Sequence, residues 1–243
     1  MITPKKLGKE PLLEAICEVR FSSDKESVIN LLPGILYQKY KDRFNKIINL
    51  PAKNLPVNIL KQDPALKYTP TIRLDSESYL IQLGEHVVSL SCRKPYKGWT
   101  EFKSEIEGLV EKLQETDLIT NPERFSLKYI DIIPSEVNNS LSALNVDVRL
   151  GNHEVTTESI SIRTEKEEDG FIHIIQVGSP VKAKLSSDDE YDGVMLDIDT
   201  IKKPEADFWG NFSSNLDRAH QLNKEMFFSL LTEKTLSALI PEY

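Results

Sequence analysis

Residues 12–22 read LLEAICEVRFS, and this stretch decides the fold. One side of an extended chain carries the small and apolar residues Ala15, Cys17, Val19 and Phe21. The other side carries the charged residues Glu14, Glu18 and Arg20, with Ile16 among them. This alternation with a period of two predicts a strand that has one buried face. We expect the charged face to be solvated or to line a polar groove.

The rest of the chain shows the same kinds of pattern. Further strands are predicted at 68–74, 78–92 with a turn at Gly84-Glu85, 124–133, 144–150, 155–164, 171–178 and 193–201. Helices are predicted at 33–46 with Pro33 in the first turn, at 100–116, from about 211 onward and at 233–239. Turns or loops are expected at 49–66, 167–170 and 186–192.

Strands mostly follow one another and do not alternate with helices. The fold class predicted is therefore α+β, with one or more mostly antiparallel sheets, helices packed on one face and a long C-terminal helix. The chain divides either into an N-terminal α+β half, 1–134, and a strand-rich half, 135–243, closed by the C-terminal helix, or it forms one continuous domain.

The segment 100–116 shows the clearest helical pattern. Its apolar residues form one stripe, Phe102, Ile106, Leu109, Val110 and Leu113. Thr100 is the N-cap that the pattern favours. On the closing helix, Asn223 falls inside the apolar stripe, so we expect its amide to bond a strand backbone or line a cavity.

Composition limits the classes of protein. The chain has 243 residues, 40% of them hydrophobic, and a net charge of −8, which disfavours binding to duplex nucleic acid. No signal peptide and no apolar run long enough to span a bilayer is visible, so a cytoplasmic location is expected. Cys17 and Cys92 lie in apolar surroundings and are predicted to be buried, reduced thiols.

The N-terminal stretch resembles the opening of a sporadically distributed, uncharacterised bacterial protein family. Members begin with Pro-Leu-x-Glu-Ala, a small residue, Cys-Glu and an Arg-Phe pair, as residues 11–21 do here. The segments 96–99, 124–131 and 196–199 and the closing helix are also similar, although Lys128 and Asp131 replace the family's Arg and Asn. The resemblance implies no established activity, and the family's patchy distribution suggests an accessory or phage-defence system.

Polar side chains recur on the predicted strands. Asp197 and Asp199 share one face of their strand, and Tyr129 and Asp131 share one face of theirs, which is expected to be the same polar face. His220 lies at the edge of the closing helix's apolar stripe. The hypothesis is one cross-strand network of Glu14, Glu18, Arg20, Tyr129, Asp131, Asp197, Asp199 and His220. Its role is either structural or that of a site.

A second candidate is the basic and aromatic segment Arg93, Tyr96, Lys97 and Trp99. It either contacts a ligand or anchors a Trp over the core ahead of a helix. Nucleophile motifs, phosphate-binding glycine loops and histidine pairs at ligand spacing are absent from the sequence. We therefore assign no catalytic residue, no metal and no cofactor.

These observations rank three functions. The first is a non-enzymatic interaction or regulatory module whose partner is another protein. The second is a small-molecule-binding protein with a pocket between the sheet and the C-terminal helix. The third is an enzyme that uses Asp197, Asp199 and His220. A flat apolar surface patch would favour the first, an apolar pocket with convergent polar groups the second, and close carboxylates with perturbed pKa values in a cleft the third.

Overall fold

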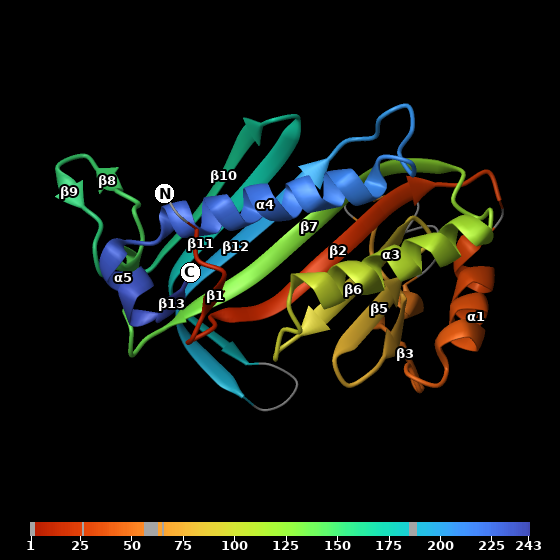
Figure 1. Ribbon diagram of the computed structural model, residues 1–243, viewed down its shortest axis with the longest axis horizontal. Coiled ribbons are helices and arrows are strands. Elements are labelled where there is room, and N and C mark those ends of the chain that lie inside the picture. The colour runs from red at the N-terminus through yellow and green to blue at the C-terminus, as the bar shows by residue number, and fades with distance from the viewer. Residues whose placement is uncertain (1–2, 26, 56–62, 65, 185–188) are drawn as a thin grey trace. The chain divides into compact units, whose positions relative to one another are not determined.

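The computed structural model describes residues 3–25, 27–55, 63–64, 66–184 and 189–243. Its main feature is a nine-stranded antiparallel sheet in the order β10-β11-β12-β7-β2-β6-β5-β4-β3, with helices packed on it (Figure 1). The predicted α+β class is confirmed. The strands are β2 Leu12–Ser22, β3 Lys46–Asn49, β4 Ile72–Asp75, β5 Tyr79–Leu83, β6 Val87–Arg93, β7 Asn121–Pro134, β10 Ile160–Glu168, β11 Phe171–Lys184 and β12 Glu190–Lys202.

Two further strand pairs lie outside this sheet. They are β1 Lys6–Leu7 with β13 Pro241–Glu242, and β8 Arg149–Leu150 with β9 His153–Glu154. The helices are α1 Val28–Tyr40, α3 Trp99–Glu115, α4 Phe212–Leu230 and α5 Glu233–Ala238, and two short 3₁₀ turns cover Pro51–Asn54 and Leu141–Ala143.

The chain forms two compact units. Unit 1 comprises Met1–Glu14, Lys128–Ile201 and Asp217–Tyr243, and unit 2 comprises Ala15–Leu127 and Lys202–Leu216. Each unit is described below by itself. The division at residue 134 stays a prediction.

In unit 2, strand β2 has the alternation that its sequence predicts. Ala15, Cys17, Val19 and Phe21 are all buried, whereas the charged residues between them are half-exposed. The stripe of α3 is buried as expected, and Tyr40 of α1 donates a hydrogen bond to the carbonyl of Gly108 in α3 at 3.1 Å. Tyr79 of β5 donates to Glu101 of α3 at 3.0 Å, so this helix covers the face of the sheet that carries Tyr79.

The start of α1 is where the sequence prediction is wrong. The helix begins at Val28, and Pro33 lies inside it. The carboxylate of Glu85 accepts hydrogen bonds from the backbone amides of Val28 and Ile29, both at 3.2 Å. A helix N-terminus needs such acceptors, and here a residue far along the chain supplies them. No local cap was present to reveal the true start.

Two smaller predictions on element ends are also wrong. Gly98, not Thr100, precedes the first residue of α3, and its φ of 90° is one that glycine adopts without strain. Residues 190–192 belong to β12, although they were expected in an acidic loop, and 185–188 of that loop lie outside the described residues.

In unit 1, β10 and β11 form a long hairpin that pairs Ile160 with Ser179 and Glu168 with Phe171. The turn predicted at 167–170 is confirmed. Asp169 and Gly170 both have positive φ, 54° and 74°, as a two-residue turn matched to strand twist requires.

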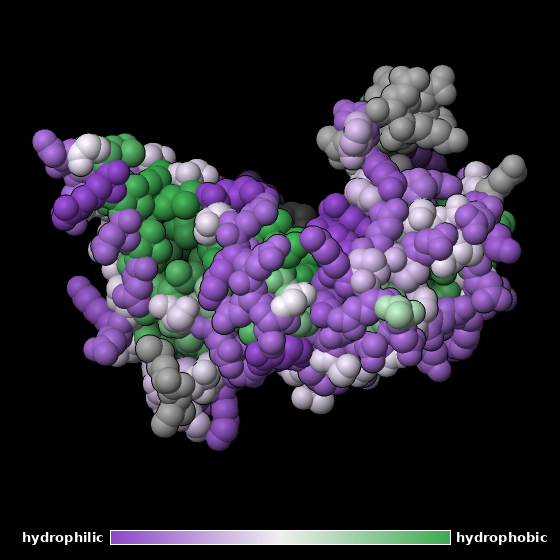
Figure 2. All heavy atoms as spheres, turned by 90° about the horizontal axis from the view of Figure 1, so that it is seen from above, coloured by the Kyte–Doolittle hydropathy of each residue, from purple (hydrophilic) through white to green (hydrophobic). Residues whose placement is uncertain are grey.

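Helix α4 covers one face of the unit 1 strands. The Asn223 amide donates to the carbonyl of Ile198 in β12 at 2.8 Å, so the prediction for this residue is confirmed. Beneath the helix lies an apolar core that includes Leu196, Ile198 and Phe227. Partly buried apolar residues border that core, and Figure 2 shows hydrophobic surface gathered over the end of unit 1 that holds α5 and the last turns of α4.

Cys17 and Cys92 are free and buried, as predicted. Within the described residues, no helix is long and apolar enough to cross a bilayer.

We predict that Leu109→Ala lowers the free energy of unfolding by roughly 2–5 kcal/mol, because it leaves a cavity under α3. Urea denaturation measures the change. The matched control is Gln114→Ala, at an exposed position of the same helix, which is expected to change stability by less than about 0.5 kcal/mol. Equal effects of the two changes would show that α3 does not bury this face.

Candidate functional site

In unit 1, the side chains of Tyr129 and His220 form a buried pair under α4. The Tyr129 hydroxyl lies 2.9 Å from Nδ1 of His220, and the two rings are 5.9 Å apart. Burial lowers the pKa of His220 to about 4, helped by the charge of Lys224, whereas Asp217 opposes the shift. His220 is therefore neutral at pH 7, as expected of a boundary histidine bonded to a sheet residue.

Asp131 lies two residues beyond Tyr129 on the same face of β7. It is 6% exposed. Burial raises its pKa well above the ordinary value, and the nearby charges of Glu10 and Asp197 add to the shift. A carboxyl group in such surroundings favours its protonated form.

Asp197 lies on the opposite face of the unit 1 strands. It accepts hydrogen bonds from Lys128 at 2.9 Å and from Gln176 at 3.2 Å, and Lys128 is the neighbour of Tyr129 on β7. Because side chains alternate along a strand, Tyr129 and Asp197 point to opposite faces. The expectation that they share one polar face is wrong.

The other predicted members of the network lie on β12 and β2. Asp199, two residues beyond Asp197, and Glu14 on β2 are both half-buried. Arg20 belongs to unit 2, and the three aspartates belong to unit 1. A single network that joins all eight residues stays a prediction.

Sequence analysis missed a third polar group of unit 1, around His173. His173 is fully buried, and its Nδ1 lies 3.1 Å from the Thr200 hydroxyl, which also accepts from Asn223 at 3.0 Å. Nε2 of His173 bonds to nothing in the part of the chain that the structure describes. Because its strand alternates Phe171, His173 and Ile175, the pattern alone showed that this histidine faces the core.

Unit 2 brings charged side chains together on the face of the sheet that α3 does not cover. Glu18 accepts hydrogen bonds from Arg20 at 2.6 Å and from Arg124 at 3.2 Å. The Arg20 guanidinium stacks on the ring of Tyr68, 4.4 Å from its centre. Tyr68 and Lys67 both donate to Glu123, and their hydrogen bonds lower its pKa although burial acts to raise it.

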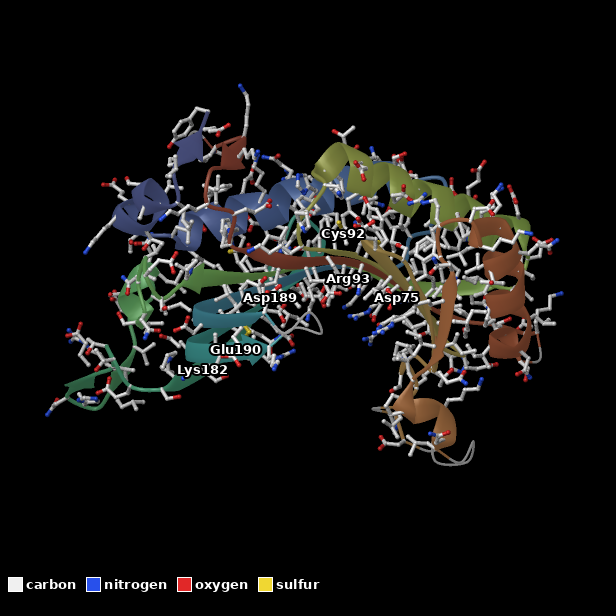
Figure 3. The ribbon with its side chains drawn as sticks, turned by 90° about the horizontal axis from the view of Figure 1, so that it is seen from below. Asp75, Cys92, Arg93, Lys182, Asp189 and Glu190 are labelled. Atoms are coloured by element: carbon white, nitrogen blue, oxygen red, sulfur yellow. The ribbon has the colours of Figure 1, made fainter. Side chains whose placement is uncertain are left out.

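A second arginine pair lies on β4 and β6. Asp75 contacts Arg73 at 3.2 Å and Arg93 at 2.8 Å. Figure 3 shows Asp75 and Arg93 on the side of the strands away from α3, and Cys92 towards that helix. Arg93 therefore points away from the apolar core of unit 2.

Small polar side chains lie between these charges. The printed registers place Arg73 opposite Gln82, and Gln82 opposite Ser89, so the three share one face of β4, β5 and β6. Ser91, two residues along β6, shares it too. Both serines are buried, and neither hydroxyl bonds to another described residue. We call Arg20, Arg73, Arg93, Arg124, Ser89 and Ser91 the arginine face.

The segment 93–99 does not form one patch. Arg93 belongs to the arginine face, but the Tyr96 ring packs edge-on against Phe102 of α3, with 6.0 Å between their centres. Lys97 is exposed, and Trp99 is half-buried at the start of α3. The strand ends at Arg93, and the chain then turns towards the helix, which separates the members of the predicted patch.

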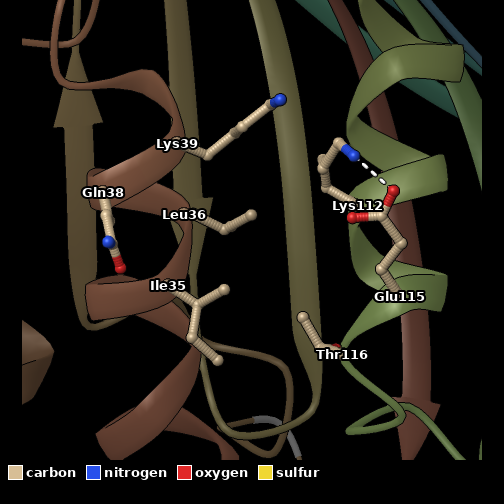
Figure 4. A pocket seen from close by; sticks show the side chains of 7 residues that line it. All are labelled: Ile35, Leu36, Gln38, Lys39, Lys112, Glu115 and Thr116. Carbon is tan, nitrogen blue, oxygen red and sulfur yellow. Dashed lines mark hydrogen bonds and ion pairs between the residues drawn. The ribbon is translucent and has the colours of Figure 1, made fainter.

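Unit 2 also has a hollow of about 610 Å³ between α1 and α3 (Figure 4). Its lining mixes apolar and charged side chains, Ile35, Leu36, Gln38, Lys39, Lys112, Glu115 and Thr116. Lys112 is paired with Glu115. The hollow is not at the place between the sheet and the C-terminal helix where the sequence led us to expect a pocket.

Among the described residues, no group of three or more His, Cys, Asp or Glu side chains is arranged to hold a metal ion. No protein-family model matches the chain, and comparison with curated proteins finds no match to it either. The resemblance to an uncharacterised bacterial family stays a prediction.

We predict that His220 makes the protein less stable in mild acid. Its pKa is about 4 when folded and about 6.5 in an unfolded chain. Between these values only the unfolded chain binds the proton, so this contribution is lost as the pH falls from about 6.5 to 4. Urea unfolding of the wild type and His220→Gln should differ by roughly 3 kcal/mol less at pH 4 than at pH 7.5. A pH-independent difference would contradict this, and His153→Gln, at an exposed position, is the control.

Asp131 is predicted to act in the opposite direction. Its raised pKa means that the folded protein holds a proton which the unfolded chain has lost, so stability falls as the pH rises through that pKa. Asp131→Asn removes this penalty while it preserves size. We expect the variant to gain stability relative to wild type as the pH rises from 5 to 8, measured by urea unfolding. Asp147→Asn, at an exposed position outside this face, should show no such trend.

Proposed function

We propose that this protein is a non-enzymatic interaction module and that its partner is a protein segment that binds in extended form along β10. The observation that carries the proposal is an apolar groove beside a bare sheet edge in unit 1. All the residues that form it belong to that unit.

The groove runs between β10 and the last turns of α4. Its walls are partly buried apolar side chains that border the core, Ile160 and Ile162 of β10, Met226 and Leu230 of α4, and Val146 and Val148 of the preceding segment. Hydrophobic surface gathers at this end of unit 1 in Figure 2. Contiguous apolar surface of this kind marks interaction sites on soluble proteins.

Strand β10 offers backbone groups next to that groove. Every residue of β10 is paired with β11 on one side, and β10 is the last strand in the sheet order, so its other edge has no neighbour. An exposed edge can accept one more strand, which gains main-chain hydrogen bonds and pockets for alternate side chains. The charged residues of β10 oppose indiscriminate pairing and leave the edge to a partner of matching charge.

Charge selects the partner. Unit 1 holds 12 Lys and Arg residues and 21 Asp and Glu residues, a net charge of −9, whereas unit 2 has a net charge of +1. Arg163 and Lys166 of β10 already pair with Glu165 and Glu168. A second copy of so acidic a unit would be repelled, and a basic segment would be attracted. The partner therefore carries basic residues opposite Glu165 and Glu167 and apolar residues opposite Ile160 and Ile162.

The test uses a labelled peptide, Thr-Lys-Thr-Lys-Thr-Thr-Ile-Thr-Ile, whose pattern fits an antiparallel strand beside β10. We expect fluorescence anisotropy to show saturable binding with a Kd on the order of tens of micromolar. A peptide of the same composition in scrambled order should bind at least about tenfold more weakly. Equal binding of both peptides, or of neither, would overturn the proposal.

Protein variants locate the binding. Ile162→Glu places a charge in the groove, and Glu167→Lys reverses one on the bare edge, so each should weaken the designed peptide by about tenfold. The controls are Ile47→Glu, on the exposed strand β3, and Glu154→Lys, on β9. Circular dichroism establishes that each variant is folded. Loss of binding in the controls as well would show non-specific charge attraction.

A further inference from the structure

We infer that the arginine face of unit 2 binds a phosphate group carried by a small molecule. This inference is independent of the β10 groove, because every residue that it uses lies between Ala15 and Leu127.

Each carboxylate on this face is shared by two guanidinium groups. Glu18 lies between Arg20 and Arg124, and Asp75 lies between Arg73 and Arg93. One carboxylate neutralises one arginine, so each group keeps one positive charge. Lys67 and Glu123 pair with each other and add none. The face therefore carries a net charge of +2, which matches a phosphate monoester near its doubly ionised state.

The arginines also keep donors for a ligand. Glu18 engages only Nε of Arg20 and one terminal nitrogen of Arg124. Nε of Arg73 and Nε of Arg124 are buried and bond to nothing in the described residues. Buried donors without an acceptor are costly, and a small rotation of either guanidinium towards an anion would satisfy them. The side chains of Arg20, Arg73, Arg93 and Arg124 remain between 21% and 30% exposed.

The floor of the face suits a compact anion. β6 lies between β2, which carries Glu18 and Arg20, and β5 and β4, which lead to Arg73. Ser89 and Ser91 therefore lie between the two arginine pairs, with small side chains that leave room and hydroxyls that can donate. Arginine forks and serine hydroxyls are the groups that bind phosphate oxygens in two or more directions.

The ligand is a small molecule and not a nucleic acid strand. Unit 2 as a whole has a net charge of only +1, and the full chain has −8. A polyanion needs many phosphate contacts over a long surface, whereas two arginine pairs with a short serine floor fit a single phosphate or pyrophosphate.

Isothermal titration of the full chain with pyrophosphate, ATP and a single-stranded thymidine oligonucleotide tests the inference. We expect pyrophosphate and ATP to bind with a Kd below about 1 mM and the oligonucleotide to bind no more tightly per phosphate. Stronger binding of the oligonucleotide would overturn the assignment to a small molecule. No binding of any probe would overturn the site itself.

Arg73→Gln and Arg124→Gln should each weaken pyrophosphate binding by about tenfold, as expected for losing a charge-assisted hydrogen bond. Both variants leave one arginine on the shared carboxylate, so neither carboxylate is left alone. The matched control is Arg43→Gln, a unit 2 arginine that pairs with Glu105 of α3, whose loss should change the affinity by less than about twofold. If all three variants bound equally, the arginine face would not be the site.

Discussion

The constraint on which this structure depends is that only one face of the sheet is covered by helices. In unit 2, α3 covers the face that holds Cys17, Phe21 and Tyr79, and in unit 1, α4 covers the face that holds Leu196 and Ile198. Side chains on the covered faces are removed from water, so polar groups there must find partners. Asn223 does so on the carbonyl of Ile198, and His220 on the hydroxyl of Tyr129.

The uncovered faces follow a different rule. Charged side chains stay partly hydrated there and pair across strands, as Arg124 does with Glu18 and Lys128 does with Asp197. Such pairs add little to stability when solvent reaches them, so they are free to serve recognition. The two proposals concern different consequences of this arrangement. One uses the sheet edge at which the apolar cover of α4 is incomplete, and the other uses a surplus of guanidinium groups on a face that has no cover.

The fold was largely readable from local patterns. The strand at 12–22 was predicted with its true ends, and the helix at 100–116 was misplaced by one residue, because period-two and period-four alternation report directly which face is buried. Errors arose where a distant residue decides an element's end. Glu85 caps α1 from another part of the chain, so nothing local to residues 27–33 indicated where that helix begins.

The sequence by itself determined the α+β class, the buried thiols of Cys17 and Cys92, the core side of each main element and the hydrogen-bonded burial of Asn223. Only the tertiary structure decided which polar residues meet. It placed Tyr129 and Asp197 on opposite faces, separated Arg93 from Tyr96, and brought Arg73 to Asp75 beside Arg93. The physical reason is that a pattern along one strand fixes the direction of its side chains but not the neighbouring strands or their register, and both are needed to form a site.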